Sequence, residues 1–105
     1  MEAYASWRNY KFKVCRPDGP WRDVRGVYIF AKLTIDGHWT PLYIGETVSL
    51  ADRLSGHERW AEAEDLGATY IHVREDRSYM RCCRVEEELI RYYHPPLNDH
   101  HKRGR

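Results

Sequence analysis

Residues 26–45, GVYIFAKLTIDGHWTPLYIG, decide the fold of this chain. Within this stretch, Val27–Leu33 and Thr40–Gly45 are rich in β-branched and aromatic residues, and the turn-forming pair Asp36-Gly37 lies between them. Two such runs joined by an Asp-Gly turn predict an antiparallel β-hairpin. The hairpin gives the rest of the chain a sheet on which to pack.

The segments after the hairpin predict two helices, a third strand and a last helix. Ser49 followed by Asp52 is a capping-box pattern, so a helix is expected to begin there. A second helical run over 57–66 ends before a glycine. Residues 68–74 alternate in the manner of a half-buried strand, and a helix is predicted over 78–94, where two prolines end it.

Glu86 occupies an unusual place on this last predicted helix. A projection at roughly 100° per residue puts Glu86 in the middle of an apolar stripe, whereas Glu87 and Glu88 lie about 100° and 200° away and are expected to be solvated. The other members of the stripe are Tyr79, Cys82, Cys83, Leu89, Ile90 and Tyr93. An unpaired carboxylate there is costly, so Glu86 needs a cation, hydrogen-bond donors or a water-filled pocket.

The residues before the hairpin carry a weaker signal. Residues 10–14 alternate like a strand, and Arg16–Pro20 has turn composition. Residues 1–25 hold six Lys/Arg and three Asp/Glu, so they are expected to form either a basic arm that touches substrate or an extra strand. Residues 26–98 are expected to form the main domain, and 99–105 a basic polar tail.

Composition favours one globular domain inside the cell. The chain has 105 residues, of which 42% are hydrophobic and 13% aromatic, enough for a single modest core. No apolar run approaches the roughly 20 residues of a membrane span, and three cysteines suggest no disulfide framework, so a cytoplasmic location is expected. The net charge of +1 hides basic ends around an acidic segment, 58–77, a pattern that suits a bound polyanion.

Several motifs at fixed spacing resemble the GIY-YIG nuclease family. They are, in order, Gly26-Val27-Tyr28, Tyr43-Ile44-Gly45, Arg53, His57, Glu86 and Asn98. Valine in the first tripeptide is a conservative variation, and the spacing selects the same acid, Glu86, that the helical projection selects independently. The resemblance covers residues 26–98. It departs from the family only in a long loop at Thr34–Thr40, which should affect the hairpin tip alone.

The resemblance implies an α+β (α/β) fold, with a small three-stranded antiparallel sheet flanked by helices. It also implies a metal-dependent DNA endonuclease that hydrolyses phosphodiester bonds. Glu86 would be the ligand of a single Mg²⁺ or Mn²⁺ that keeps most of its waters. Arg53 would hold the scissile phosphate, because its planar fork suits phosphate oxygens.

Two residues compete for the role of general base. The family implies Tyr28, with Tyr43 beside it to orient water. A free tyrosine has a pKa of about 10, so this use requires nearby cations. His57, which normally titrates near neutrality, is the alternative proton acceptor. Asn98 is implied either to orient a tyrosine or to fix the segment after the last helix.

The sequence leaves the substrate and the pathway, such as DNA repair or restriction, open. Specificity would come from residues 1–25, from a homodimer or from a protein partner, and branched or nicked DNA suits a domain that reads shape. The alternative function is a non-catalytic nucleic-acid-binding or interaction module that retains the fold. In that case Arg53 and Glu86 would be a structural ion pair; the presence of Tyr28, Arg53 and Glu86 together favours catalysis.

Overall fold

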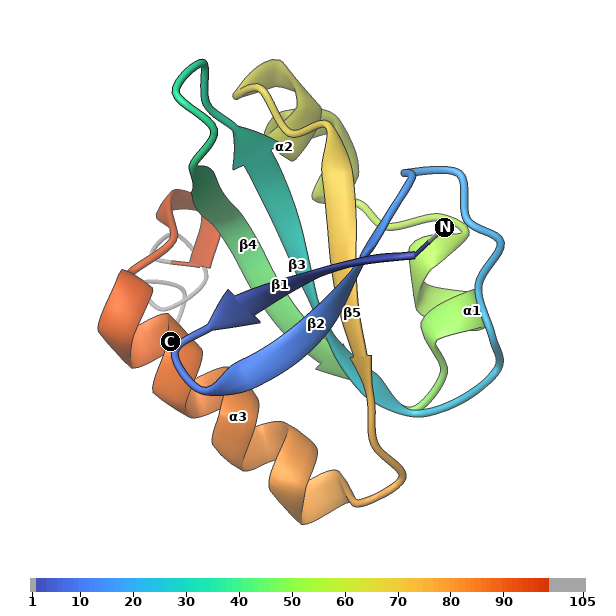
Figure 1. Ribbon diagram of the computed structural model, residues 1–105. Helices are drawn as coiled ribbons and strands as arrows, with labels where there is room; N and C mark the ends of the chain where they lie inside the picture. The colour runs from blue at the N-terminus through green and yellow to red at the C-terminus, as the bar shows by residue number, and fades with distance from the viewer. Residues whose placement is uncertain (1, 99–105) are drawn as a thin grey trace.

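An antiparallel sheet of five strands forms the centre of the computed structural model, which describes residues 2–98 (Figure 1). The strands are β1 (Ala3–Trp7), β2 (Tyr10–Cys15), β3 (Gly26–Leu33), β4 (Trp39–Thr47) and β5 (Tyr70–Glu75). The helices are α1 (Leu50–Leu54), α2 (Trp60–Asp65) and α3 (Tyr79–Tyr93). The strand order across the sheet is β1-β2-β5-β3-β4.

The expectation of a three-stranded sheet is wrong, because the sheet has two further strands. β3, β4 and β5 make the expected three, and a hairpin of β1 and β2 extends the sheet from β5, with Lys13 opposite Val73. The alternation of residues 10–14 signalled β2. The turn at Arg8-Asn9 carried little signal, because Arg8 adopts a positive φ of 56° that favours glycine or asparagine. The boundary at residue 25 stays a prediction.

The hairpin of β3 and β4 is confirmed, and its register explains the two motif glycines. Tyr28 lies opposite Gly45, where a Cβ would sit 2.5 Å from Tyr28 Cζ. A Cβ on Gly26 would sit 2.7 Å from the carbonyl oxygen of Arg74. Both glycines therefore provide space, one for an aromatic ring and one for the neighbouring strand. β4 continues beyond Gly45 to Thr47, contrary to the prediction.

The two faces of the sheet bury separate cores. Alternation along β3 sends Tyr28 and Phe30 to the face covered by α1 and α2, and Val27 and Ile29 to the face covered by α3 (Figure 1). The first core also contains Leu42, Leu50, Leu54 and Ile71; the second also contains Trp7, Phe12, Ile44, Val85 and Leu89. Any site shared by Tyr28 and α3 must therefore lie at an edge of the sheet.

The helix starts predicted at Ser49 and Ser78 are confirmed. Each serine hydroxyl accepts a backbone N–H from three residues on, at 3.1 and 3.2 Å respectively. α3 ends at His94, which adopts a left-handed φ of 50°. None of the helices within residues 2–98 is long and apolar enough to cross a membrane. The predicted basic tail, 99–105, lies outside the described residues.

The predicted apolar stripe of α3 is partly wrong. Its buried side chains are Cys82, Val85 and Leu89, so Glu86 lies at the margin of the buried face and not at its centre. Tyr79, expected in the stripe, is 58% exposed. Glu88, which was expected to be solvated, accepts hydrogen bonds from Tyr10 Oη at 2.7 Å and from Arg8 Nε at 3.0 Å. Glu88 therefore ties the N-terminal hairpin to α3.

Candidate active site

Three of the predicted site residues meet on the α1–α2 face of the sheet. Tyr28 Oη lies 2.7 Å from Nε2 of His57, which the chain places between α1 and α2. The ring of Tyr43 lies 5.1 Å from that of His57 and 6.2 Å from that of Tyr28, measured between centroids. Tyr28 and His57 are buried and Tyr43 is half-buried, so this cluster opens to solvent on the Tyr43 side.

Hydrogen bonds fix the direction of proton donation between His57 and Tyr28. The backbone N–H of Arg59 donates to His57 Nδ1 at 3.0 Å, so the neutral ring carries its proton on Nε2 and donates to the Tyr28 oxygen. Burial, and then the charge of Arg53, lower the pKa of His57 to about 4. His57 is therefore neutral near pH 7, and both of its nitrogens are engaged.

The environment of Tyr28 opposes its ionisation. Burial, and then the neighbouring Tyr43, raise the pKa of Tyr28 well above its ordinary value. Arg53 acts in the opposite direction, by its charge and by a hydrogen bond, but does not overcome the burial. A tyrosine that acts as a base requires nearby positive charge, and among the protein's own groups Arg53 supplies only part of it.

Arg53 lies close to Tyr28, but its guanidinium group binds a carboxylate. Nη1 and Nη2 donate to the two carboxylate oxygens of Glu58, each at 2.8 Å. The hydrogen bonds from Arg53 are the main reason that the pKa of Glu58 falls to about 2. The carboxylate partner of Arg53 is therefore Glu58, and the alternative of a structural pair between Arg53 and Glu86 is wrong. Glu58 occupies the bidentate geometry that a phosphate also uses.

Glu86 faces a second carboxylate that the sequence analysis missed. Burial, then repulsion from Glu46 and from Glu87, raise the pKa of Glu86 to about 7, while a backbone N–H of Glu46 partly offsets the rise. Glu86 is also close enough to Tyr28 and Tyr43 to raise the pKa of each. Glu86 on α3 is thus within electrostatic range of both tyrosines.

The carboxylate of Glu46 lacks a full set of partners. Its Oε2 atom is buried with no hydrogen-bond partner, and Arg25 Nη1 lies 3.6 Å away, beyond hydrogen-bond distance. Glu46 directly follows the second tripeptide and shares the α3 face of β4 with Ile44. That alternation was readable from the sequence, but the approach of α3 to this end of β4 was not.

Asn98 fixes β4 to the segment after α3. Its Nδ2 donates to the carbonyl oxygen of Ile44 at 2.9 Å, and its Oδ1 accepts the backbone N–H of Ile44 at 2.8 Å. β4 is an edge strand, so these bonds satisfy backbone groups that no further strand pairs. Asn98 thereby holds the residue between Tyr43 and Gly45 and contacts neither tyrosine hydroxyl by a hydrogen bond.

The donor set beside β4 fits a hard divalent cation. Within residues 2–98, no group of three or more His, Cys, Asp and Glu side chains is arranged to hold a metal. Glu86 and Glu46 nevertheless offer carboxylate oxygens, and Oε2 of Glu46 is buried without a hydrogen-bond partner, with Arg25 Nη1 3.6 Å away as its ion-pair partner. A cation here would keep most of its ligands as water, as Mg²⁺ does in many sites.

Solved structures with this arrangement of elements support the fold. No protein-family model matches the sequence, and no curated protein matches it. Two solved structures of the GIY-YIG N-terminal endonuclease domain of UvrC from Thermotoga maritima, both point mutants bound to a catalytic divalent cation, are 23% and 25% identical to this chain, with TM-scores of 0.59 and 0.58. Each match covers 72% of this chain and 83% of the UvrC domain. The fold of this chain is therefore the GIY-YIG fold that its motif spacing predicts.

Proposed function

We propose that this protein is a metal-dependent DNA endonuclease that hydrolyses phosphodiester bonds. The observation that carries the proposal is that Arg53 and Glu86 each lie close enough to Tyr28 to alter its pKa, while His57 Nε2 lies 2.7 Å from Tyr28 Oη. A base, a phosphate-binding cation and a metal-binding carboxylate in one place are the groups that phosphodiester cleavage needs. The similar UvrC domains, which are endonuclease domains bound to a divalent cation, support it further.

Glu86 would hold Mg²⁺ or Mn²⁺, with Glu46 as the second carboxylate beside it. The cation would supply positive charge to the phosphate as the reaction proceeds. Arg53 would bind the oxygens of the scissile phosphate, either by exchanging Glu58 for the phosphate or through its remaining N–H groups. Asn98 would keep β4, and with it Tyr43, in position beside the phosphate.

Tyr28 is the proposed general base, with His57 as its hydrogen-bond donor. The attacking water would give its proton to Tyr28 Oη while Tyr43 orients that water. His57 Nε2 donates to the same oxygen, so it stabilises the phenolate and is not itself the base. Because burial raises the pKa of Tyr28, the phenolate is scarce near neutral pH, and the cleavage rate is expected to rise as the pH rises.

The proposed substrate is branched or nicked DNA recognised by its shape. The site lies at one edge of a small sheet, where helices and strands of the core itself supply the side chains. A homodimer or a protein partner would then add selectivity for one DNA structure.

The test compares cleavage by the wild type, Glu86→Gln and the matched control Glu87→Gln. Supercoiled plasmid and labelled branched oligonucleotides are incubated with Mg²⁺ or Mn²⁺, or with EDTA. We expect metal-dependent nicking or cutting by the wild type and by Glu87→Gln, because Glu87 is exposed. Glu86→Gln keeps the size of the side chain but removes its charge, so its cleavage rate should fall by at least about 10²-fold.

Two results would contradict the proposal. Equal cleavage by Glu86→Gln and the wild type would remove Glu86 from the reaction. Binding of DNA by the wild type without cleavage of any of these substrates would leave the non-catalytic binding module as the function.

A further inference from the structure

A hollow lies between the N-terminal hairpin, β5 and the loop before β3. It measures about 430 Å³, and its basic side chains are Lys11, Lys13, Arg22 and Arg74, against the acids Glu2 and Glu75. Lys11 and Lys13 come from β2, one of the two strands that extend the sheet beyond the expected three. The hairpin therefore adds cationic surface as well as strands.

A second hollow continues the first toward the candidate active site. It measures about 250 Å³ and shares Arg22 and Glu75 with the first, so the two adjoin. The second adds two cations, Arg25 and Arg77, and one acid, Asp76. Together the lining residues comprise six basic and three acidic side chains, a net charge of +3 in a protein whose overall net charge is +1.

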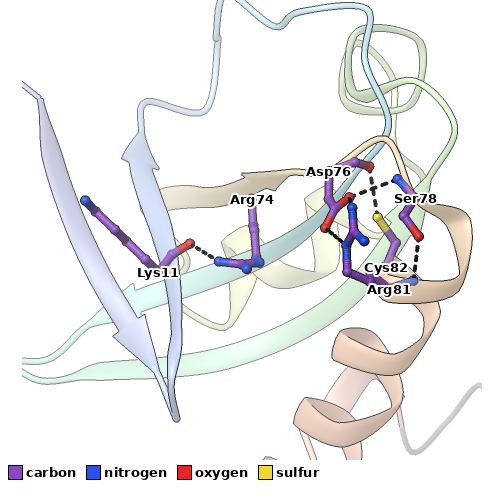
Figure 2. Close-up of polar contacts among 6 residues, drawn as sticks. All are labelled: Lys11, Arg74, Asp76, Ser78, Arg81 and Cys82. Atoms are coloured by element: carbon purple, nitrogen blue, oxygen red, sulfur yellow. Dashed lines mark hydrogen bonds and ion pairs between the residues drawn. The ribbon is translucent and has the colours of Figure 1, made fainter.

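Ion pairs within the hollows decide which of these charges are available to a ligand. Lys13 pairs with Glu2 at 3.0 Å, and Arg22 pairs with Glu75 at 2.7 Å. Both pairs involve exposed side chains, which a polyanion can replace at little cost. Asp76, by contrast, is held by Arg81 of α3 at 2.8 Å, so its main partner lies outside the hollows, although the charge of Arg74 also lowers its pKa (Figure 2).

Lys11 and Arg74 form no ion pair within the described part of the chain. Arg74 Nη1 donates to the carbonyl oxygen of Lys11 at 3.2 Å, as Figure 2 shows, and Arg74 Nε is buried without a partner. Lys11 Nζ lies 4.2 Å from the ring centroid of Tyr4, which is 51% exposed. Alternation along the hairpin puts Lys11, Lys13 and Tyr4 on the face opposite Phe12, so cations and an exposed aromatic ring share one surface, a combination that binds nucleic-acid strands.

The basic surface reaches the candidate metal-binding carboxylates through Arg25. Arg25 lines the second hollow, and its Nη1 lies 3.6 Å from Oε2 of Glu46, the neighbour of Glu86. The track of cations thus leads from the hairpin to the place where the scissile phosphate would lie. An acidic peptide would also find cations here, but only a long polyanion that continues past Arg25 uses the whole track.

We propose that the two hollows bind the sugar–phosphate backbone of the DNA strand that flanks the cleavage site, with Lys11 and Lys13 as its main contacts. This inference rests on the proposed endonuclease function for its substrate. The hairpin supplies the binding surface that the catalytic part of the sheet lacks. Tyr4 offers a face on which an unpaired base of branched DNA stacks.

The test measures DNA affinity over a series of salt concentrations, in EDTA so that no cleavage occurs. It compares the wild type with Lys11→Ala/Lys13→Ala and with a control of equal charge change, Arg84→Ala/Arg91→Ala, on the exposed side of α3. Each lost phosphate contact lowers the slope of log K against log[salt] by about 0.9 on duplex DNA, so the hairpin variant should lose about 1.8. The control should keep the wild-type slope.

Several outcomes would overturn the inference. One is an unchanged salt slope in the hairpin variant, and another is an equal loss of slope in the hairpin variant and the control. A third is a hairpin variant that keeps its DNA affinity but no longer binds polyglutamate, which would assign the surface to an acidic polypeptide. Circular dichroism of each variant checks that it is folded. If the wild type cuts no DNA but the hairpin variant still loses the slope, the endonuclease proposal fails and the binding surface stands.

Discussion

The carboxylates of the candidate site compete for few positive charges. Arg53 is engaged by Glu58, and Arg25 approaches Glu46, so Glu86 is left without a basic partner within the described residues. A half-buried carboxylate without a basic partner keeps its proton or binds a cation. The same imbalance that raises the pKa of Glu86 thus makes it suitable for a metal ion.

The pairing of Arg53 with Glu58 predicts that Glu58 limits DNA binding. In Glu58→Gln the fork of Arg53 is released and a negative charge near the phosphate is removed. An exposed ion pair is worth about 0.2–1 kcal/mol, so we expect the affinity for DNA in EDTA to increase by up to about fivefold. Fluorescence anisotropy with a labelled oligonucleotide measures the change.

Glu62→Gln provides the control for Glu58→Gln. Glu62 of α2 pairs with Arg59, the residue before this helix, so its loss removes the same charge from a pair that does not include Arg53. Weaker binding by Glu58→Gln than by Glu62→Gln would contradict the prediction and would mean that Glu58 holds Arg53 in place for the phosphate.

The sequence was sufficient to find the motif residues but not their partners. Glu86 was selected twice, by its place on a helix and by its spacing from the tripeptides. Glu46 and Glu58 escaped because their roles depend on which side chains approach them in space: α3 for Glu46 and the fork of Arg53 for Glu58. A spacing motif records residues that act on a ligand, whereas such partners are set by register and loop conformation.

At the scale of elements, the N-terminal hairpin is part of the core. Trp7 and Phe12 are 3% and 0% exposed, in the cluster that α3 covers. Trp7 Nε1 donates to His72 Nδ1 of β5 at 2.9 Å, and Tyr10 and Arg8 donate to Glu88. An appended arm would not bury two large aromatic rings against the rest of the sheet.

We therefore predict that the hairpin and the rest of the described chain unfold together. Phe12→Ala should lower the free energy of unfolding by about 3–5 kcal/mol, because it leaves a cavity in the shared core. Tyr4→Ala, on the exposed side of the same hairpin, should change it by less than about 0.5 kcal/mol. Urea unfolding followed by circular dichroism and by tryptophan fluorescence gives both values.

Coincidence of the two probes is the decisive observation for this prediction. Separate transitions in the wild type, or an unchanged midpoint in Phe12→Ala, would show that residues 1–25 unfold apart from 26–98, as the predicted domain boundary suggests.

The helices and the central hairpin were predictable because their signals are local: a serine cap, an Asp-Gly turn and an alternating run. β1 was not, because Ala3–Trp7 acquires its strand character from pairing with β2 and from the burial of Trp7. Tertiary contacts outweigh the weak intrinsic preference of such a segment. The position of α3 at the edge beside β4, on which the site depends, is likewise a property of the packed sheet.

For the whole molecule, two buried neutral histidines connect protonation to folding. His57 and His72 each have a pKa lowered to about 4, chiefly by burial. His72 is completely buried, and Trp7 donates to its Nδ1, so its proton lies on Nε2, which has no hydrogen-bond partner. An additional proton would have to break the bond to Trp7 and place a charge inside the core.

The unfolded chain takes up this proton with an ordinary pKa of about 6.5, whereas folded His72 resists it until the pH reaches about 4. The unfolded state therefore binds more protons between these values, and stability is full above about pH 6.5 and declines as the pH falls toward 4. The free energy of unfolding that is lost through His72 alone is about 3 kcal/mol.

The variant His72→Gln tests this prediction, because its amide oxygen still accepts a hydrogen bond from Trp7. Urea unfolding at several pH values should show that its free energy of unfolding declines less than that of the wild type, by about that amount. His38→Gln, which alters a histidine with a 78% exposed side chain, should retain the wild-type decline. A wild-type decline in His72→Gln would mean that His72 takes up its proton equally in the folded and unfolded chains.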